Sequence, residues 1–262
     1  MLHGWVEDPV VVKGALQVAA ALVPAVAVIG LSRLRELDLE AEIGVSLVRG
    51  LVQILAIGSV LGLLLSVQLA WSGLILAAMM VAAAVISHRR AEGLPQAFWV
   101  SLAAITSGTG IVIVTMTWAG AIETTVRNLV PVGSMVIYAG LKTNSLALDR
   151  LRGELDSQRD RIETRLALGA SGTDALRPEV RTSVKASLIP VVDSLRSLGL
   201  VWIPGMMAGM VLSGANPVYA AEYQFVIMGM VFGASGLTAV ATTALMSHRV
   251  FTEAHQLRVE AT

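Results

Sequence analysis

The sequence contains no cysteine among its 262 residues. This absence excludes disulfides, thiolate metal sites and cysteine nucleophiles. Charged residues are also few, at 15%, whereas hydrophobic residues make up 55% and the mean hydropathy is +0.72. One soluble core cannot bury so large an apolar fraction, so we expect the lipid bilayer to be the main solvent. Lys plus Arg and Asp plus Glu both total 19, so net charge gives no indication of a nucleic-acid partner.

Histidine is scarce as well, and its positions exclude two further kinds of site. The four histidines lie in the tails or at the ends of apolar runs: His3, His88, His248 and His255. A serine within an apolar run, such as Ser107, therefore has no histidine base within reach, which argues against an intramembrane serine protease. No His, Asp or Glu lies inside an uncharged apolar run. We therefore predict no metal site within the membrane interior of one copy.

A nucleotide-binding loop is also missing. No stretch fits the pattern G-x-x-x-x-G-K-[ST], because the nearest candidate, residues 140–143, lacks the glycine spacing. Gly108-Thr109-Gly110 follows no predicted strand, so we interpret its glycines as points of close helix packing rather than a cofactor loop. Any ATP and Mg that power this protein should therefore bind a separate partner chain, and we expect this chain to bind no cofactor.

Seven stretches come close to the roughly 20 apolar residues that a helix needs to cross a hydrocarbon layer of about 30 Å. We therefore predict an all-α, polytopic membrane protein, a single permease domain over residues 1–262. The acidic Glu7 and Asp8 precede the first run, where a signal peptide would be basic, so we interpret that run as a retained membrane helix. The fifth stretch is the weakest because its uncharged part stops at Leu141. The predicted spans are Gly14–Leu31, Gly50–Val67, Ala70–Ser87, Ala97–Ile122, Asn128 to about Leu148, Ser197–Ala221 and Tyr223–Ser247.

Positive charge is distributed unevenly among the connections between these spans. Of the 19 Lys and Arg residues, all but Lys13 and Arg127 follow the first, third, fifth or seventh span. Positively charged loops stay in the cytoplasm. We therefore predict an inner (plasma) membrane protein with its N-terminus outside and its C-terminus in the cytoplasm.

The connection 142–196, which we call the coupling segment, is predicted to be a cytoplasmic helical extension. Apolar residues recur at helical spacing over Leu148–Leu168, so the fifth helix should continue about 30 Å beyond the membrane. Gly169 is expected to end this helix, and Thr173 or Asp174 to cap the next one. A helix, a glycine break and a second helix are what a membrane subunit needs to receive a push from a soluble ATPase.

Three parts of the sequence carry a family resemblance. Glu163 precedes Gly169 by six residues in IETRLALGAS, as in the EAA loop of binding-cassette permeases. SLIPVVDSLRSLGLVWIPGMMAGMVLSGANPV, over 187–218, and the upstream SLVRGLVQ and VPVGSMV extend the match over most of the chain. The chain thus resembles the FetB-type family of ABC transporter permeases, which is associated with iron export in bacteria and with aluminium tolerance and nucleotide-sugar transport in plants.

The resemblance implies a membrane subunit that pairs with a cytoplasmic ABC ATPase, with two permease chains forming a homodimer. The predicted ATPase-coupling residues are Glu163, Arg165, Leu168, Gly169, Ala170, Ser171 and Arg177. Gly205 with Gly209, and Gly229 with Gly233, lie four residues apart on a helical face, so we predict close helix packing there, within one subunit or between two.

A substrate path is predicted from polar and sulfur-bearing side chains in the spans. Arg49 and Gln53 lie four residues apart on one helical face, and a cation at a membrane helix suggests either function or an interfacial anchor. Met206, Met207 and Met210 could contact a soft metal, although methionine more often fills apolar gaps. Outside the path, Asp193 and Arg196 are expected to neutralise each other at the interface.

The sequence therefore predicts a non-enzymatic permease subunit that exports iron or a related metal. Two alternatives stay open: an ABC permease for a sugar nucleotide or another small solute, and a secondary transporter that works alone. The second alternative is disfavoured because the sequence shows neither repeated halves nor ionisable groups at mid-membrane.

Overall fold

The computed structural model describes residues 9–64, 68–91, 93–251 and 257, and every regular element within them is a helix. The chain divides into two units, residues 1–66 and 67–262. The first unit contains α2 (Pro9–Leu34) and α3 (Glu40–Leu64), which contact each other. Predictions that involve Glu7, Asp8, His3, His255 or the end of the second span at Val67 lie outside the described residues.

Helix α3 begins ten residues earlier than the second predicted span. Glu40 and Glu42 occupy its first turn, where carboxylates interact favourably with the helix dipole. The apolar stretch suited to a membrane is Glu40–Ser59, and Arg49 is its tenth residue rather than a residue just before it. The helix thus includes a charged start that the predicted span, an uncharged run from Gly50, leaves out.

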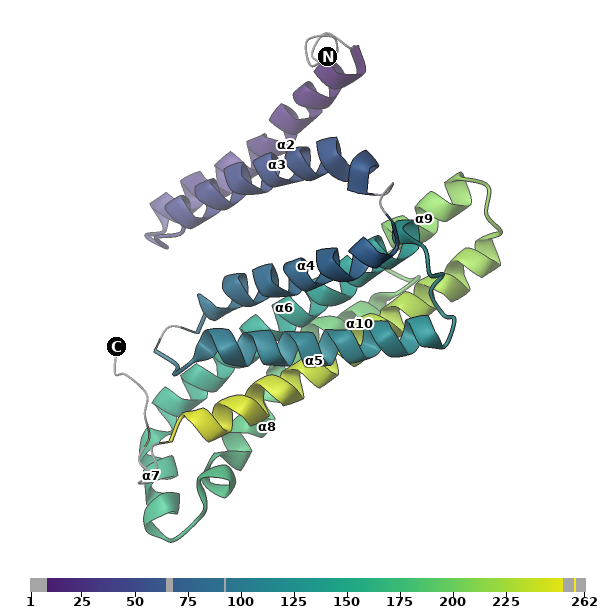
Figure 1. The fold of residues 1–262 in the computed structure, drawn as a ribbon. Coiled ribbons are helices and arrows are strands. Elements are labelled where there is room, and N and C mark those ends of the chain that lie inside the picture. Colours follow the sequence, from purple (N-terminus) through teal and green to yellow (C-terminus); the bar gives the residue numbers. More distant parts are fainter. Residues whose placement is uncertain (1–8, 65–67, 92, 252–256, 258–262) are drawn as a thin grey trace. The chain divides into compact units, whose positions relative to one another are not determined.

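The second unit is a bundle in which α4, α5, α6 and α10 lie side by side, while α8 packs against α6 and α10 (Figure 1). Helix α7 lies at one end of this unit and α9 lies at the other, and we call these the α7 end and the α9 end. The helices are α4 (Ala70–His88), α5 (Ala97–Trp118), α6 (Val126–Ser157), α7 (Arg159–Ala167), α8 (Gly172–Ser197), α9 (Gly205–Leu212) and α10 (Pro217–Arg249).

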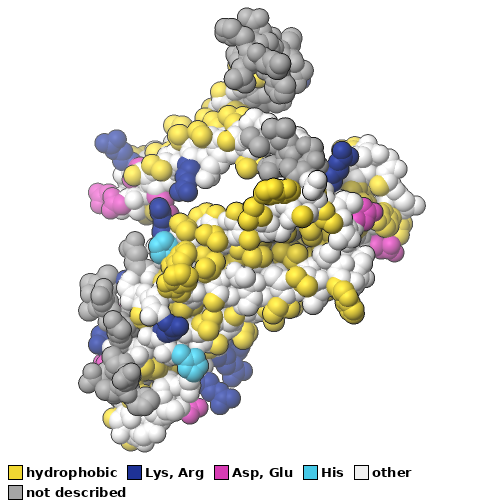
Figure 2. Space-filling model, in the orientation of Figure 1, with side chains coloured by type: hydrophobic (Ala, Val, Ile, Leu, Met, Phe, Trp, Pro, Cys, Tyr) yellow, Lys and Arg dark blue, Asp and Glu magenta, His cyan; other side chains and the backbone are white. Residues whose placement is uncertain are grey.

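Five helices in the described ranges are long and apolar enough to cross a membrane, namely α2, α3, α4, α5 and α10. Their outward side chains are apolar: in Figure 2 hydrophobic side chains cover α4 and α5, and Leu74, Trp99 and Val114 are among the exposed residues there. Helix α6, the weakest predicted span, is less apolar but lies alongside α4, α5 and α10. The chain is therefore a polytopic membrane protein.

The sixth predicted span, Ser197–Ala221, is not one helix. Helix α8 ends at Ser197, α9 covers only eight residues, and α10 starts at Pro217. Gly199 adopts φ +76°, and Pro204 has no N–H to offer a continuing helix. Gly214 and the Asn216 cap then separate α9 from α10. Apolar composition alone predicted continuity because it does not register these breaks.

The bundle is tightest where α5, α6 and α10 cross. A Cβ added at Gly108 would lie 2.7 Å from the backbone N of Thr238 on α10, and one added at Gly140 on α6 would overlap Thr109. Helices with such small residues can bring their backbones close together. The interpretation of Gly108 as a packing point is therefore confirmed, whereas a Cβ at Gly110 would meet no atom within 4 Å.

A buried polar cluster joins four helices near this crossing. Asn144 on α6 donates from Nδ2 to Ser87 Oγ on α4 (2.5 Å) and to Ser101 Oγ on α5 (2.8 Å). Its Oδ1 accepts from Thr242 Oγ1 on α10 (2.5 Å), and Ser145 donates to the same Ser87 Oγ (2.9 Å). Side-chain hydrogen bonds of this kind hold membrane helices together. The sequence analysis did not single out these residues.

Candidate functional site: the coupling segment

The predicted continuation of the fifth helix is confirmed. Helix α6 runs for 32 residues, about 48 Å, and carries the chain from the α9 end into the charged segment. It stops at Ser157, and Gln158 (φ −111°, ψ 16°) turns the chain into α7, so the extension is two helices rather than one. Gly169 then adopts φ +92°, which confirms the predicted glycine break.

Helix α8 starts with a side-chain cap one turn before the expected position. Ser171 Oγ accepts from the backbone N of Asp174 (3.2 Å), and it also donates to the Asp174 carboxylate (2.6 Å). Thr173 and Asp174 therefore lie inside the first turn of α8 instead of capping it. A serine three residues before an acidic residue is a recognised helix start, and Gly169-Ala170 separated it from the preceding helix in the sequence.

A buried ion pair ties α7 to α8. Arg165 Nη1 and Nη2 each donate to one oxygen of Glu179, both at 2.9 Å, and Nη1 also donates to the backbone O of Ala175. The Glu179 side chain is 3% exposed and that of Arg165 is 30% exposed. The hydrogen bonds with Glu179 raise the pKa of Arg165, so this guanidinium stays charged. A two-pronged Arg–carboxylate pair fixes orientation as well as distance.

An apolar core underlies this pair. Leu151 and Leu155 of α6, Ile162 of α7 and Leu176 of α8 are fully buried together with Met246 of α10. Beyond α10, Val250 is buried in the same cluster, and the ring of Phe251 lies so close to Gly172 that a Cβ there would come within 2.8 Å of it. The coupling segment is thus packed directly onto the end of a membrane helix.

At the tip of the segment, residues 168–171, Leu168, Gly169 and Ser171 are exposed, whereas Ala170 is half-buried and packs against the apolar core. The Leu168 side chain is 82% exposed, and a Cβ added at Gly169 would meet no atom within 4 Å. Glu163 is exposed as well and accepts from Arg159 Nε at 3.0 Å on its own helix, and Arg177 is exposed on α8. Most of the predicted coupling residues therefore lie on an exposed surface, whereas Ala170 is half-buried and Arg165, 30% exposed, anchors α7 to α8.

The predicted substrate-path residues lie in different places. Met206 and Met210 line a cavity of about 720 Å³ at the α9 end, whereas Met207 does not line it. Arg49 and Gln53 are exposed on α3 in the first unit. Polar residues surround the cavity beside the two methionines: Glu123, Arg127, Asn128, Tyr219, Glu222 and Tyr223.

The predicted glycine pairs make few close contacts. A Cβ added at Gly205, Gly209 or Gly229 would meet no atom within 4 Å, and one at Gly233 would lie 3.6 Å from Val112. The close approaches in the described chain involve Gly108, Gly133, Gly140 and Gly172 instead. The predicted close packing at Gly205, Gly209 and Gly229 is therefore not seen within one subunit. Asp193 and Arg196, by contrast, lie 3.7 Å apart as expected.

No group of three or more His, Cys, Asp or Glu residues that could hold a metal ion occurs in the part of the chain that the structure describes. The sequence analysis missed Glu179, although a signal for it exists. Glu179 belongs to a buried series at four-residue spacing on α8: Ala175, Glu179, Ser183, Ser187 and Val191. Because this series is partly polar, a search for apolar periodicity does not find it.

Comparison with known proteins gives one family. The model of an uncharacterised protein family, UPF0014, matches residues 15–251. Protein ALUMINUM SENSITIVE 3 of Arabidopsis thaliana is 32% identical over 95% of this chain and 92% of its own length. The UPF0014 membrane protein STAR2 of Oryza sativa subsp. japonica is 32% identical over 92% of this chain and 84% of its own length.

A bacterial relative carries a name that states a function. The "Probable iron export permease protein FetB" of Escherichia coli (strain K12) is 31% identical over 92% of this chain and 93% of its own length. No solved structure matches the chain significantly.

Proposed function

We propose a transport function for this chain, which belongs to the UPF0014 family: it is the membrane subunit of an ABC transporter and exports iron or a related metal ion. The observation that carries the proposal is the coupling segment. It is exposed at its tip, held rigid by the Arg165–Glu179 pair and packed onto α6 and α10. The name of the Escherichia coli relative supports the direction and the cargo.

In this proposal the chain crosses the inner (plasma) membrane seven times, with the α7 end in the cytoplasm. The basic residues of the coupling segment favour that side. The sixth crossing is discontinuous and consists of the second half of α8, the turn 198–204 and α9. Broken helices are tolerated at membrane depth where protein covers them. The turn 198–204 is largely exposed in one chain, with Leu200 88% and Val201 87% exposed, so in this proposal the second permease copy covers it.

The absence of cysteine offers a direct test of this topology. Single variants Thr173→Cys, beside the tip, and Ser213→Cys, after α9, place one thiol at each end of the second unit. A thiol reagent that cannot cross membranes should label Ser213→Cys in intact cells and label Thr173→Cys only after permeabilisation. The reverse pattern would show that the coupling segment lies outside and would exclude cytoplasmic ATPase docking.

The proposed mechanism couples ATP hydrolysis on a partner to movement of the membrane helices. A cytoplasmic ABC ATPase binds ATP and Mg and receives the exposed Leu168 in a groove on its surface. Closure of two ATPases pushes the α7–α8 turn, and α6, a single helix from Val126 to Ser157, carries the displacement to the α9 end. Rigid-body rotation of helices in two permease copies then opens a path outward.

The cavity at the α9 end is the proposed exit for the cargo. Glu123, Glu222, Tyr219 and Tyr223 offer oxygen atoms there, and Met206 and Met210 offer sulfur. Carboxylates suit hard cations better than thioethers do. A passing metal would therefore use the carboxylates transiently, with Arg127 limiting how tightly it is held. A sugar nucleotide or another small solute stays the alternative cargo, which the family resemblance of the sequence implies.

Co-purification tests the docking step. Leu168→Gln removes an exposed apolar contact at the tip, and Leu212→Gln makes the same change at a residue that is equally exposed, 89%, at the α9 end. We expect Leu168→Gln to reduce the amount of co-expressed ABC ATPase that purifies with the chain at least tenfold and Leu212→Gln to leave it unchanged. Equal retention of the ATPase by both variants would contradict the docking assignment.

Gly169→Pro tests the tip geometry in the same assay. Proline fixes φ near −65°, whereas Gly169 requires +92°, so the turn between α7 and α8 cannot form as it is. Hydrolysis by the partner ATPase should then no longer be stimulated by the chain. Transport is measured separately, with vesicles that contain both subunits and are offered ferrous iron and a sugar nucleotide side by side. ATP-dependent movement of the sugar nucleotide alone would replace the metal as cargo.

A further inference from the structure

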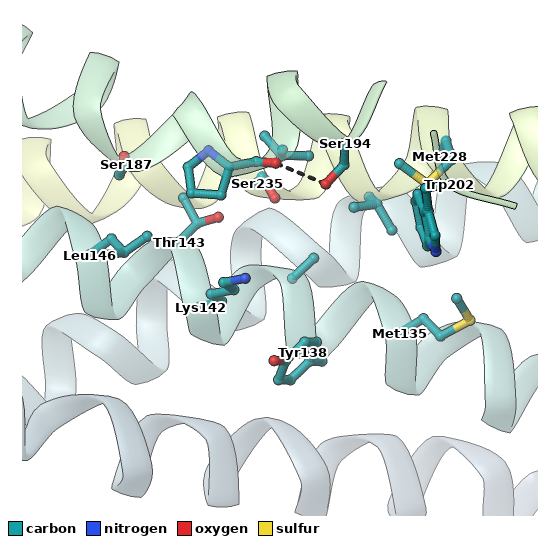
Figure 3. Close-up of a pocket in the computed structure, with 14 residues that line it drawn as sticks. Met135, Tyr138, Lys142, Thr143, Leu146, Ser187, Ser194, Trp202, Met228 and Ser235 are labelled. Carbon is teal, nitrogen blue, oxygen red and sulfur yellow. Dashed lines mark hydrogen bonds between the residues drawn. The ribbon is translucent and has the colours of Figure 1, made fainter. Parts of the chain in front are cut away.

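A second cavity, of about 250 Å³, opens between α6, α8 and α10 (Figure 3). Its walls are mostly apolar, and all of its lining residues belong to the second unit. In Figure 3, Met135, Met228 and Trp202 lie at one end of the cavity, while Thr143, Lys142 and Ser235 lie toward the other. This cavity is separate from the one that contains Met206 and Met210, and neither the coupling mechanism nor the proposed exit uses it.

The polar end of the cavity contains groups without partners. Ser235 is 1% exposed, and its Oγ has no hydrogen-bond partner among the described residues. Lys142 makes no ion pair in the described part of the chain, and no Asp or Glu lines the cavity. The hydroxyls of Ser187 and Ser194 differ from that of Ser235 because they donate to their own helix. An unsatisfied buried hydroxyl beside an unpaired cation favours an anionic, hydrogen-bonding ligand.

The position of the cavity along the bundle narrows the ligand further. Lys142 is 16 residues after Val126, the start of α6, or about 24 Å along the helix. Asn144 of α6 bonds to Thr242 of α10, and a Cβ on Gly140 would approach Thr238, so Ser235 lies at the level of about residue 137, about 17 Å along α6. A hydrocarbon layer is about 30 Å thick. Lys142 therefore lies near one membrane interface and Ser235 about 7 Å deeper, whereas Met135, about 14 Å along α6, places the apolar end near the bilayer centre.

We propose that this cavity binds one anionic phospholipid from the surrounding leaflet. Its phosphate contacts the Lys142 ammonium and accepts from Ser235 Oγ, and one acyl chain extends past Met135, Met228 and Trp202. The sequence of charge, hydroxyl and apolar surface along the membrane normal matches that of a lipid molecule. A soluble anion would leave the apolar end unfilled, and a second protein copy would have to supply a carboxylate at this depth. The proposal does not depend on the transport function.

Lipid binding to the purified full-length chain tests the proposal without an ATPase or a transported solute. The delipidated protein is titrated with phosphatidylglycerol or with phosphatidylcholine of the same acyl chains, and bound lipid is measured by native mass spectrometry. We expect one molecule of phosphatidylglycerol to bind at least tenfold more tightly than phosphatidylcholine. Equal affinity for the two lipids, or no lipid bound, would overturn the proposal.

Two lysine variants locate the binding. Lys142→Gln should weaken phosphatidylglycerol binding about tenfold, since it removes one charge-assisted contact. Lys185→Gln removes the same charge from an exposed position of α8 that does not line the cavity, and it should change the affinity less than twofold. An equal loss in both variants would indicate nonspecific surface attraction and would contradict the site.

Ser235→Leu provides an independent measurement by filling the cavity. The tight binding of phosphatidylglycerol should disappear in this variant, while Ser235→Ala, which removes only the hydroxyl, should weaken it by a smaller factor. A Ser235→Leu protein that is folded and still binds phosphatidylglycerol as tightly as the unmodified chain would overturn the assignment. If Ser235→Leu does not fold, the comparison of Lys142→Gln with Lys185→Gln decides the question alone.

Discussion

The polar cluster around Asn144 gives the most direct prediction about how the membrane bundle is held together. Asn144 is fully buried, and its side chain makes three hydrogen bonds, one to each of three other helices. Asn144→Leu keeps a similar shape but removes all three bonds. Interhelical hydrogen bonds in membranes contribute about 0.6 kcal/mol each on average and at most about 1.7 kcal/mol. The expected loss is therefore about 2 kcal/mol, with an upper bound of about 5 kcal/mol.

The partners that stay behind refine this magnitude. The single hydroxyl hydrogen of Thr242 can turn from Asn144 to the backbone O of Thr238 (2.7 Å), and Ser87 Oγ still accepts from Ser145 (2.9 Å). Ser101 is the neighbour that loses its partner, because its Oγ accepts from Asn144 Nδ2 in the described structure. One deprived hydroxyl rather than three keeps the penalty for unsatisfied groups small, so the loss should stay near the lower figure.

The assay is reversible unfolding of the purified chain in mixed detergent micelles, followed by circular dichroism. Asn128→Leu is the matched control, because it makes the same substitution on the same helix at a residue that bonds only to the exposed Glu123 (2.7 Å). We expect the control to change the free energy of unfolding by less than about 0.5 kcal/mol. If Asn144→Leu also changes the free energy of unfolding by less than about 0.5 kcal/mol, the cluster does not stabilise the bundle.

Three other changes have defined outcomes. Arg165→Met should lower the free energy of unfolding by about 3 kcal/mol because it leaves the Glu179 carboxylate buried and unpaired. Adding Glu179→Leu should restore most of this free energy. A double variant no more stable than the single one would contradict a pair that contributes no net stability. Gly108→Val should lower the thermal midpoint of unfolding by an amount that corresponds to about 2 kcal/mol, whereas Gly110→Val, where the added Cβ meets no atom, should not change it. Ser171→Ala should destabilise the start of α8 by about 1 kcal/mol, measured by hydrogen exchange of its first-turn amides, and unchanged exchange would exclude the cap.

Much of the fold could be predicted because helices that face lipid are recognisable from their high content of apolar residues. The first, third, fourth and seventh predicted spans correspond to α2, α4, α5 and α10, with ends that shift by a few residues. The extension of the fifth helix followed from apolar spacing, and the break at Gly169 followed from glycine's access to positive φ. Each of these features is determined by residues close together in the sequence.

Other features depended on information that a hydropathy reading does not contain. The early start of α3 depends on the favourable placement of Glu40 and Glu42 at a helix N-terminus, not on apolar residues. The division of the sixth span depends on Gly199 and Pro204, which interrupt an otherwise apolar run. The electrostatics of a helix N-terminus in the first case, and backbone geometry in the second, rather than transfer into lipid, determined where a helix starts or ends.

The residues of the candidate sites were the hardest to predict, and the structure gives a physical reason. In this bundle many side chains that face other helices are polar, among them Asn144, Thr242 and Thr238, whereas Leu74, Val114 and other exposed residues are apolar. In a lipid solvent a buried polar group can be satisfied only by protein, so polar side chains gather where helices meet. Apolar periodicity therefore finds the surface that faces lipid and misses the surface that faces protein. Ser235, which lines the cavity between α6, α8 and α10, lies on that second surface, where a single buried polar residue is more informative than a long apolar run.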